Sequence, residues 1–130
     1  MSPDLLQKYS IGNFHFPVKS AMDSILVSKD SILEVVQKVK EDEELLYEQL
    51  VDVTATDNML SKSGSSKERF TIIYSFLSLK NNKRLFVFTN LSENDLDIDS
   101  ITQIFESADW YERECYDLFG INFKNHPNLQ

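Results

Sequence analysis

The residues best suited to do chemistry in this chain lie close together near its carboxy-terminal end. Glu112, Glu114 and Asp117 carry carboxylates, Arg113 carries a guanidinium group, and His126 follows a short apolar stretch. Carboxylates beside a histidine can serve in acid–base catalysis or hold a metal ion. These charges are interleaved with aromatic residues, a pattern that favours the end of a helix packed against another surface.

Helical geometry disfavours a shared catalytic centre at this run. On a helix, Glu112 and Glu114 project roughly 160 to 200 degrees apart, which is poor for two carboxylates binding one metal ion or one substrate. Arg113 and Asp117 are four residues apart and can form an ion pair. The chain has one cysteine, two histidines and three glycines, and we find neither a Cys–His nucleophile arrangement nor a glycine-rich phosphate loop among them. We therefore expect no metal site and no catalytic residues in this chain.

Length, charge and cysteine content limit the kind of protein that this chain can be. Its 130 residues suit a single domain, residues 1–130, that buries about two-thirds of its unfolded surface. The net charge of −8 argues against nucleic acid, which requires clustered Lys and Arg. The one cysteine, Cys115, excludes an internal disulfide and an iron–sulfur cluster held by this chain alone. The start lacks a secretory signal and no apolar run approaches the ~20 residues of a membrane span, so we expect membrane association only through partners.

Hydrophobic patterning predicts the sheet that must support the charged run. Strand-like apolar patterns occupy residues 13–18, 24–27, 47–55, 70–79 and 84–91. The last two flank Asn81-Asn82, a pair that tolerates the left-handed backbone of a tight hairpin. They are apolar on both faces, which predicts central strands covered on two sides, and a partner protein could supply one of the covers. In the strand over 47–55 we expect Val51 and Val53 on one buried face, with Leu50 out of phase.

Capping patterns predict where the helices begin and end. Ser31 begins a capping-box spacing and predicts a helix over about 31–45. Ser100 begins a second one, whose helix either continues with a kink or gives way to another helix over 110–118. Gly120 suits the end of that last helix. Its apolar stripe comprises Tyr111, Cys115 and Leu118.

These elements predict an α+β domain. We expect a two-layer sandwich in which one mixed or antiparallel sheet of about five strands has helices packed on one face. Residues 1–12 are expected to be weakly ordered, residues 57–67 to form a flexible loop, and residues 92–99 to form an acidic loop. We expect Cys115 to be a small buried hydrophobe, and Trp110 to belong either to the core or to an interface.

The carboxy-terminal run carries a resemblance to a known family. Its matching residues are Glu112-Arg113-Glu114, Asp117-Leu118-Phe119-Gly120-Ile121, Phe123 and His126-Pro127-Asn128-Leu129. Together with residues 49–57, they resemble the C subunit of respiratory NADH:quinone oxidoreductase, complex I. The resemblance covers roughly residues 43–130. Family members usually continue with a basic tail, whereas this chain ends just after the signature at Gln130, so contacts made by that tail are not carried over.

The resemblance implies a structural and assembly subunit of the peripheral arm, without catalytic residues or cofactors of its own. NADH, FMN, iron–sulfur clusters and quinone would be bound by partners, chiefly the quinone-site subunit and its iron–sulfur neighbour. The assembly would lie peripherally on the cytoplasmic side of a bacterial inner membrane, or on the matrix side in mitochondria. The implied interface and signature residues, which we expect to form buried or half-buried pairs or to fix the chain exit, are Glu112, Arg113, Glu114, Asp117, Phe119, Gly120, His126 and Pro127.

Three alternatives remain open from the sequence. The chain could be the equivalent subunit of a related membrane-bound hydrogenase. It could instead be a small free-standing hydrolase that uses Glu112, Glu114, Asp117 and His126, which would predict activity of the purified chain. A third possibility is an unrelated binding module whose acidic loops bind basic partners.

Overall fold

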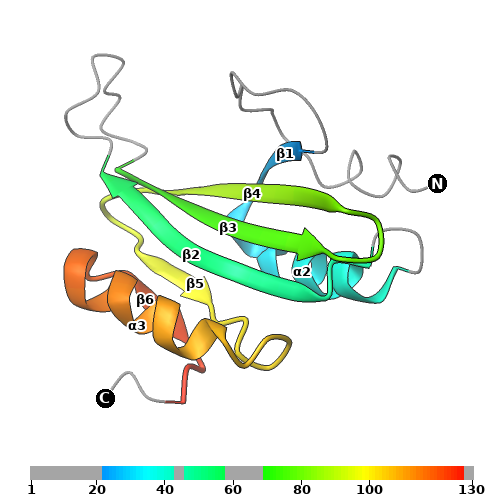
Figure 1. Ribbon diagram of the computed structural model, residues 1–130. Helices are drawn as coiled ribbons and strands as arrows, with labels where there is room; N and C mark the ends of the chain where they lie inside the picture. Colours follow the sequence, from blue (N-terminus) through cyan, green and yellow to red (C-terminus); the bar gives the residue numbers. More distant parts are fainter. Residues whose placement is uncertain (1–21, 43–45, 58–68, 128–130) are drawn as a thin grey trace.

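A four-stranded mixed sheet forms the centre of the protein in the computed structural model, which describes residues 22–42, 46–57 and 69–127 (Figure 1). Its strands lie in the order β1-β4-β3-β2. β1 is parallel to β4, and the other neighbours are antiparallel. The bounds are β1 Met22–Val27, β2 Gln49–Asp57, β3 Phe70–Ser78 and β4 Lys83–Leu91. The strand expected over 13–18 lies outside the described residues.

The β3–β4 hairpin forms where the sequence predicts it. Ser78 pairs with Lys83 at its closed end, and Asn82 adopts a φ of 52°. An asparagine tolerates this left-handed conformation better than most residues. The Ser78 hydroxyl accepts a hydrogen bond from Asn81 N at 3.2 Å. The central position predicted for both strands is confirmed.

Strand β2 contains a β-bulge, and the predicted burial of Val51 is wrong. The register with β3 shifts between Leu50 and Asp52. As a result Leu50 and Val53 are both buried, whereas Val51 is exposed. A bulge places one extra residue outside the two-residue alternation, so Leu50 is in phase with the core and Val51 is not.

Helix α2 (Ile32–Glu41) follows a short 3₁₀ turn, η1 (Lys29–Ser31). Its predicted stripe is confirmed, since the buried residues are Ile32, Val35, Val36 and Val39. The predicted capping box is wrong, because Ser31 makes no side-chain cap and the Ser28 hydroxyl instead accepts from Asp30 N at 3.3 Å. The helix also ends at Glu41 rather than near residue 45. Within the described residues, no helix is long and apolar enough to cross a membrane.

A second, two-stranded parallel sheet replaces part of the expected acidic loop. It consists of β5 (Asp97–Asp99) and β6 (Asn122–Lys124). Ile98 and Phe123 are paired and both are buried. The two strands are far apart in sequence, so the short pattern of residues 97–99 alone gives no indication of a strand.

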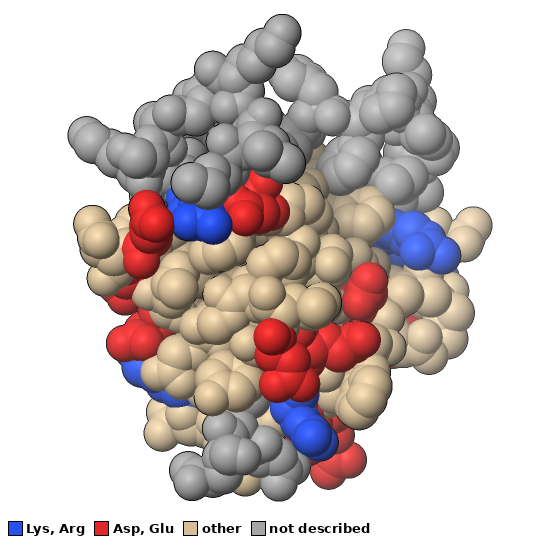
Figure 2. Space-filling model, turned by 90° about the vertical axis from the view of Figure 1, so that its left-hand side faces the viewer, with Lys and Arg blue, Asp and Glu red and all other residues tan. Residues whose placement is uncertain are grey.

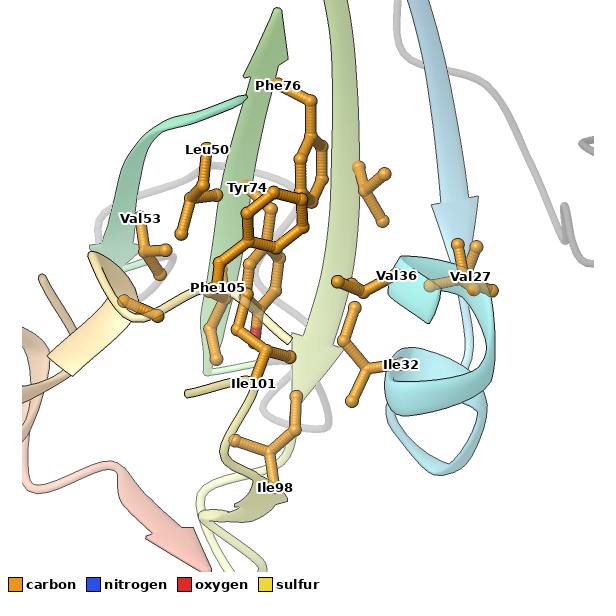
Figure 3. Close-up of a cluster of buried hydrophobic side chains, with 14 of the residues drawn as sticks. Val27, Ile32, Val36, Leu50, Val53, Tyr74, Phe76, Ile98, Ile101 and Phe105 are labelled. Carbon is orange, nitrogen blue, oxygen red and sulfur yellow. The ribbon is translucent and has the colours of Figure 1, made fainter. Parts of the chain in front are cut away.

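The core lies between the main sheet and the helices, which lie on the same side of the sheet in Figure 1. Figure 3 shows Tyr74 and Phe76 of β3 meeting Phe105 and Ile101 from the segment before the last helix, with Val36 of α2 nearby. The rings of Phe76 and Phe105 are 5.6 Å apart. The α+β class, with one sheet and helices on one face, is therefore confirmed, although the main sheet has four described strands rather than about five.

Candidate functional site at helix α3

Helix α3 (Ala108–Phe119) carries most of the signature residues. The helix expected to begin at Ser100 does not form there, because the chain makes separate turns at residues 102–104 and 106–107 before α3 begins. The predicted end is confirmed: Gly120 has a φ of 73°, and its N–H donates to Tyr116 O at 2.9 Å. Glycine adopts this left-handed conformation without a steric penalty.

The inner face of α3 covers strand β2, which lies at the edge of the described sheet. The thiol of Cys115 points to Val53 O at 3.7 Å, and the ring of Phe119 lies 5.4 Å from that of Phe70. A helix over an edge strand shields backbone groups that would otherwise be open to pairing with another chain. Cys115 is buried as expected, and burial raises the pKa of its thiol to about 12.

Glu112 is fully buried on this inner face. The apolar stripe predicted for this helix, Tyr111, Cys115 and Leu118, does not include it. Its carboxylate accepts hydrogen bonds from Ser100 Oγ at 2.7 Å and from Ile101 N at 2.9 Å. Ser100 therefore does not cap a helix but holds Glu112. Leu118, expected on the buried stripe, is 74% exposed because the helix turns Glu112 inward.

His126 joins Glu112 in the interior, although the two residues are far apart in sequence. Its side chain has no exposed surface. The Nε2 atom lies 3.0 Å from Asp109 O, 3.3 Å from Asp109 Oδ1 and 3.9 Å from Glu112 Oε1. The backbone N–H of His126 donates to Phe123 O at 3.2 Å. The first and last parts of the signature thus meet, and they fasten α3 to the segment that follows β6.

Burial dominates the electrostatics of this cluster. It raises the pKa of Glu112 to about 7, against the hydrogen bonds from Ile101 and Ser100, which lower it. The nearby charge of Asp109 raises it further. Burial also raises the pKa of the Tyr74 phenol well above its ordinary value, and the charge of Glu112 adds to that shift. No sequence signal identifies Asp109 or the binding role of Ser100, because their contacts with Glu112 and His126 depend on the folded chain.

The outer face of α3 presents the remaining charged residues of the signature. Arg113, Glu114 and Asp117 are exposed. The Arg113 guanidinium lies 5.9 Å from the ring of Trp110, a residue that is 60% exposed and so does not belong to the core. Within the described residues no ion pair joins Arg113 to Asp117. Pairing of these residues across an interface stays a prediction.

The geometry does not assemble the residues proposed for a hydrolase. Glu112 and His126 are buried, whereas Glu114 and Asp117 lie on the opposite side of the helix. A surface hollow of about 650 Å³ beside the start of α3 is lined by none of these four residues; its lining is Thr102, Gln103, Glu106, Asp109, Asn125 and Pro127. Among the described residues no group of three or more His, Cys, Asp or Glu side chains is arranged to hold a metal ion.

Comparison with known proteins decides the family. Residues 25–130 match the family model described as the 30 kDa subunit of respiratory-chain NADH dehydrogenase. The chain belongs to this family. The resemblance seen in the signature and in residues 49–57 is thereby confirmed. The part of the signature that the structure describes, residues 112–127, lies on α3, on β6 and in the segment after β6, whereas Asn128 and Leu129 lie outside the described residues.

Curated relatives in the family are named as the C subunit of NADH-quinone oxidoreductase. The protein of Citrifermentans bemidjiense is 45% identical over 106 residues, covering 82% of this chain and 62% of the relative. That of Neisseria meningitidis is 37% identical, covering 92% and 63%. A fused C/D subunit of Proteus mirabilis is 35% identical over 98% of this chain and 22% of its own length. The chain thus spans somewhat under two-thirds of the first two relatives.

Solved structures share the fold. A trypsin-resistant fragment of Nqo5 superimposes with a TM-score of 0.75 at 26% identity, covering 98% of this chain and 95% of the fragment. A chain of an archaeal membrane-bound sulfane sulfur reductase superimposes with a TM-score of 0.78 over 99% of this chain and 71% of that chain. Its identity of 18% supports a common fold and nothing further.

Proposed function

We propose that this chain is a non-catalytic structural and assembly subunit in the peripheral arm of a proton-translocating NADH:quinone oxidoreductase. It docks against the quinone-site subunit and its iron–sulfur neighbour, and these partners bind NADH, FMN, the clusters and quinone. The complex holds it at the cytoplasmic side of a bacterial inner membrane. The names of the relatives support this assignment, since they describe subunits of that enzyme.

One observation carries the non-catalytic part of the proposal. The signature residues divide between two structural tasks: Glu112 and His126 are buried and hold α3 in place, whereas Arg113 and its charged neighbours point outward. Catalytic groups need access to a substrate. Glu112 has no exposed surface, and no buried partner among the described residues orients the exposed carboxylates on the other side of the helix.

Affinity purification from the native host tests the proposal. The full-length chain is tagged at a chromosomal copy, membranes are solubilised in mild detergent, and recovered proteins are identified by mass spectrometry. We expect subunits with iron–sulfur centres and the quinone-site subunit in stoichiometric amounts, together with NADH:quinone oxidoreductase activity. Recovery of the chain alone contradicts the proposal. Recovery with hydrogenase subunits instead would assign it to the related complex.

A further inference from the structure

The outer face of α3 concentrates exposed apolar surface. Among the described residues the exposed large hydrophobic side chains are Val51, Leu79, Trp110, Tyr116 and Leu118. Three of these five, Trp110, Tyr116 and Leu118, belong to α3. Trp110 and Leu118 lie on its outer face, and Tyr116 lies beside that face. Isolated exposed hydrophobic residues are common on soluble proteins. Here Trp110 and Leu118 are grouped with charged residues on one helix face, and this grouping indicates an interaction site. We name Trp110, Arg113, Glu114, Asp117 and Leu118 the docking face.

Arg113 prepares this face for binding. Its guanidinium lies 5.9 Å from the Trp110 ring, within the range of a cation–π interaction. The contact restricts the motion of both side chains before a partner arrives, so less conformational entropy is lost on binding. Tryptophan and arginine are also the residue types most enriched among those that dominate binding energy at protein interfaces.

The charge of the docking face selects the kind of partner. Glu114 and Asp117 lie on it, and Glu106 is exposed on the turn before α3, so that acidic groups outnumber the single guanidinium of Arg113. Figure 2 shows acidic side chains around an uncharged area on the side of the molecule where α3 lies in Figure 1, with Lys or Arg side chains beside some of them. A second copy of the chain would set the same acidic groups against each other in a two-fold contact. Nucleic acid and anionic lipid are repelled for the same reason.

We propose that the docking face binds a partner protein through an apolar patch bordered by Lys or Arg side chains. Trp110 and Leu118 pack on the apolar patch, and Glu114 and Asp117 pair with the basic side chains. This inference rests on the proposed function, because it specifies the surface that the neighbouring subunit presents to α3.

Charge reversal on matched helices provides the first test. Glu114→Lys with Asp117→Lys reverses two charges on the docking face, and Glu34→Lys with Glu41→Lys makes the same change on exposed residues of α2. Each tagged full-length variant is expressed in the native host, and circular dichroism of the purified chain checks its fold. We expect the docking-face pair to recover about tenfold less partner protein per tagged chain than the α2 pair, the effect of roughly one unfavourable charge contact. Equal recovery by the two pairs overturns the inference.

Photo-crosslinking identifies the protein bound to the docking face directly. A benzoylphenylalanine replaces Leu118 in the full-length chain, the cells are irradiated, and the crosslinked peptide is sequenced by mass spectrometry. We expect a partner peptide with Lys or Arg within a few residues of the crosslink. A crosslink to another copy of this chain, a peptide without basic residues, or no crosslink overturns the inference. A basic peptide from a protein outside the oxidoreductase would support the docking face while contradicting the proposed function.

Discussion

Glu112 and Glu114 lie two residues apart on α3, yet their carboxylates have opposite surroundings. Glu112 is fully buried and accepts hydrogen bonds from Ser100 and Ile101, whereas Glu114 faces solvent. One residue of the signature therefore stabilises the fold, and its neighbour remains available to a partner. A shared motif thus combines two requirements, and a substitution at one position need not have the consequence of a substitution at the other.

Substitutions on the inner and outer faces of α3 should differ most in their effect on the free energy of unfolding. Glu112→Ala removes the acceptor for two buried donors, at a cost of about 1–3 kcal/mol for each. We expect the free energy of unfolding to fall by about 2–5 kcal/mol. Glu114→Ala, the matched control, should change it by less than about 0.5 kcal/mol. Urea unfolding of the purified chain at pH 7, followed by circular dichroism, measures both, and equal losses would refute the distinction.

The pH dependence of stability should sharpen the assignment of Glu112. Burial raises its pKa in the folded chain to about 7, above the ordinary value of 4.5, so the folded state binds the proton more tightly between these values. The contribution of Glu112 to stability is therefore largest below about pH 4.5 and falls as the pH rises to about 7, by up to about 3 kcal/mol.

Glu112→Gln removes this titration while conserving shape. The free energy of unfolding of the wild-type chain, minus that of the variant, should decrease between pH 5 and pH 7 and then level off. The subtraction cancels the titration of the groups that do not interact with Glu112. Curves that stay parallel over this range would show that the carboxylate is not held in the buried environment described.

Arg113→Ala should affect assembly and leave the fold unchanged. Loss of the guanidinium releases Trp110 and removes an exposed charge, so we expect about fivefold less assembled complex, a loss of roughly 1 kcal/mol at the interface. Turnover per assembled complex should not change. Arg84→Ala, an exposed arginine on β4, is the matched control. Native gel electrophoresis of membranes combined with activity staining separates the two quantities; normal assembly with slow turnover would indicate a catalytic role.

The smallest effect is expected at Leu118. Because this side chain is 74% exposed, Leu118→Ala should change the free energy of unfolding by less than about 0.5 kcal/mol. Leu85 is fully buried on β4, and Leu85→Ala should cost about 2–5 kcal/mol. Similar losses of unfolding free energy for the two substitutions would indicate that Leu118 is buried, as the sequence predicts.

Features of the fold that depend on neighbouring residues were predictable. The Asn81-Asn82 hairpin, the stripe of α2 and the end of α3 at Gly120 follow from backbone preferences and from a period of a few residues. The family signature also located the relevant helix. Each of these features is determined by residues close together in the sequence, so contacts with distant parts of the fold have little effect on it.

Features that depend on distant contacts were not predictable. Val51 leaves the core because of a bulge set by the pairing of β2 with β3. Ser100 has the sequence spacing of a helix cap, but its hydroxyl binds Glu112. A buried glutamate is rare, so helical periodicity assigns such a residue to solvent unless its partners are known. Here those partners are Ser100, Ile101 and the neighbouring His126.

Accessibility of Trp110 tests the account most directly, since it is the one tryptophan of the chain and belongs to the docking face. Hydroxyl-radical footprinting with mass spectrometry can compare its oxidation rate in the purified chain with the rate in the intact complex. We predict rapid oxidation in the free chain and strong protection in the complex, while the buried Tyr74 stays protected in both. Equal oxidation of Trp110 in the two samples would contradict docking through this face.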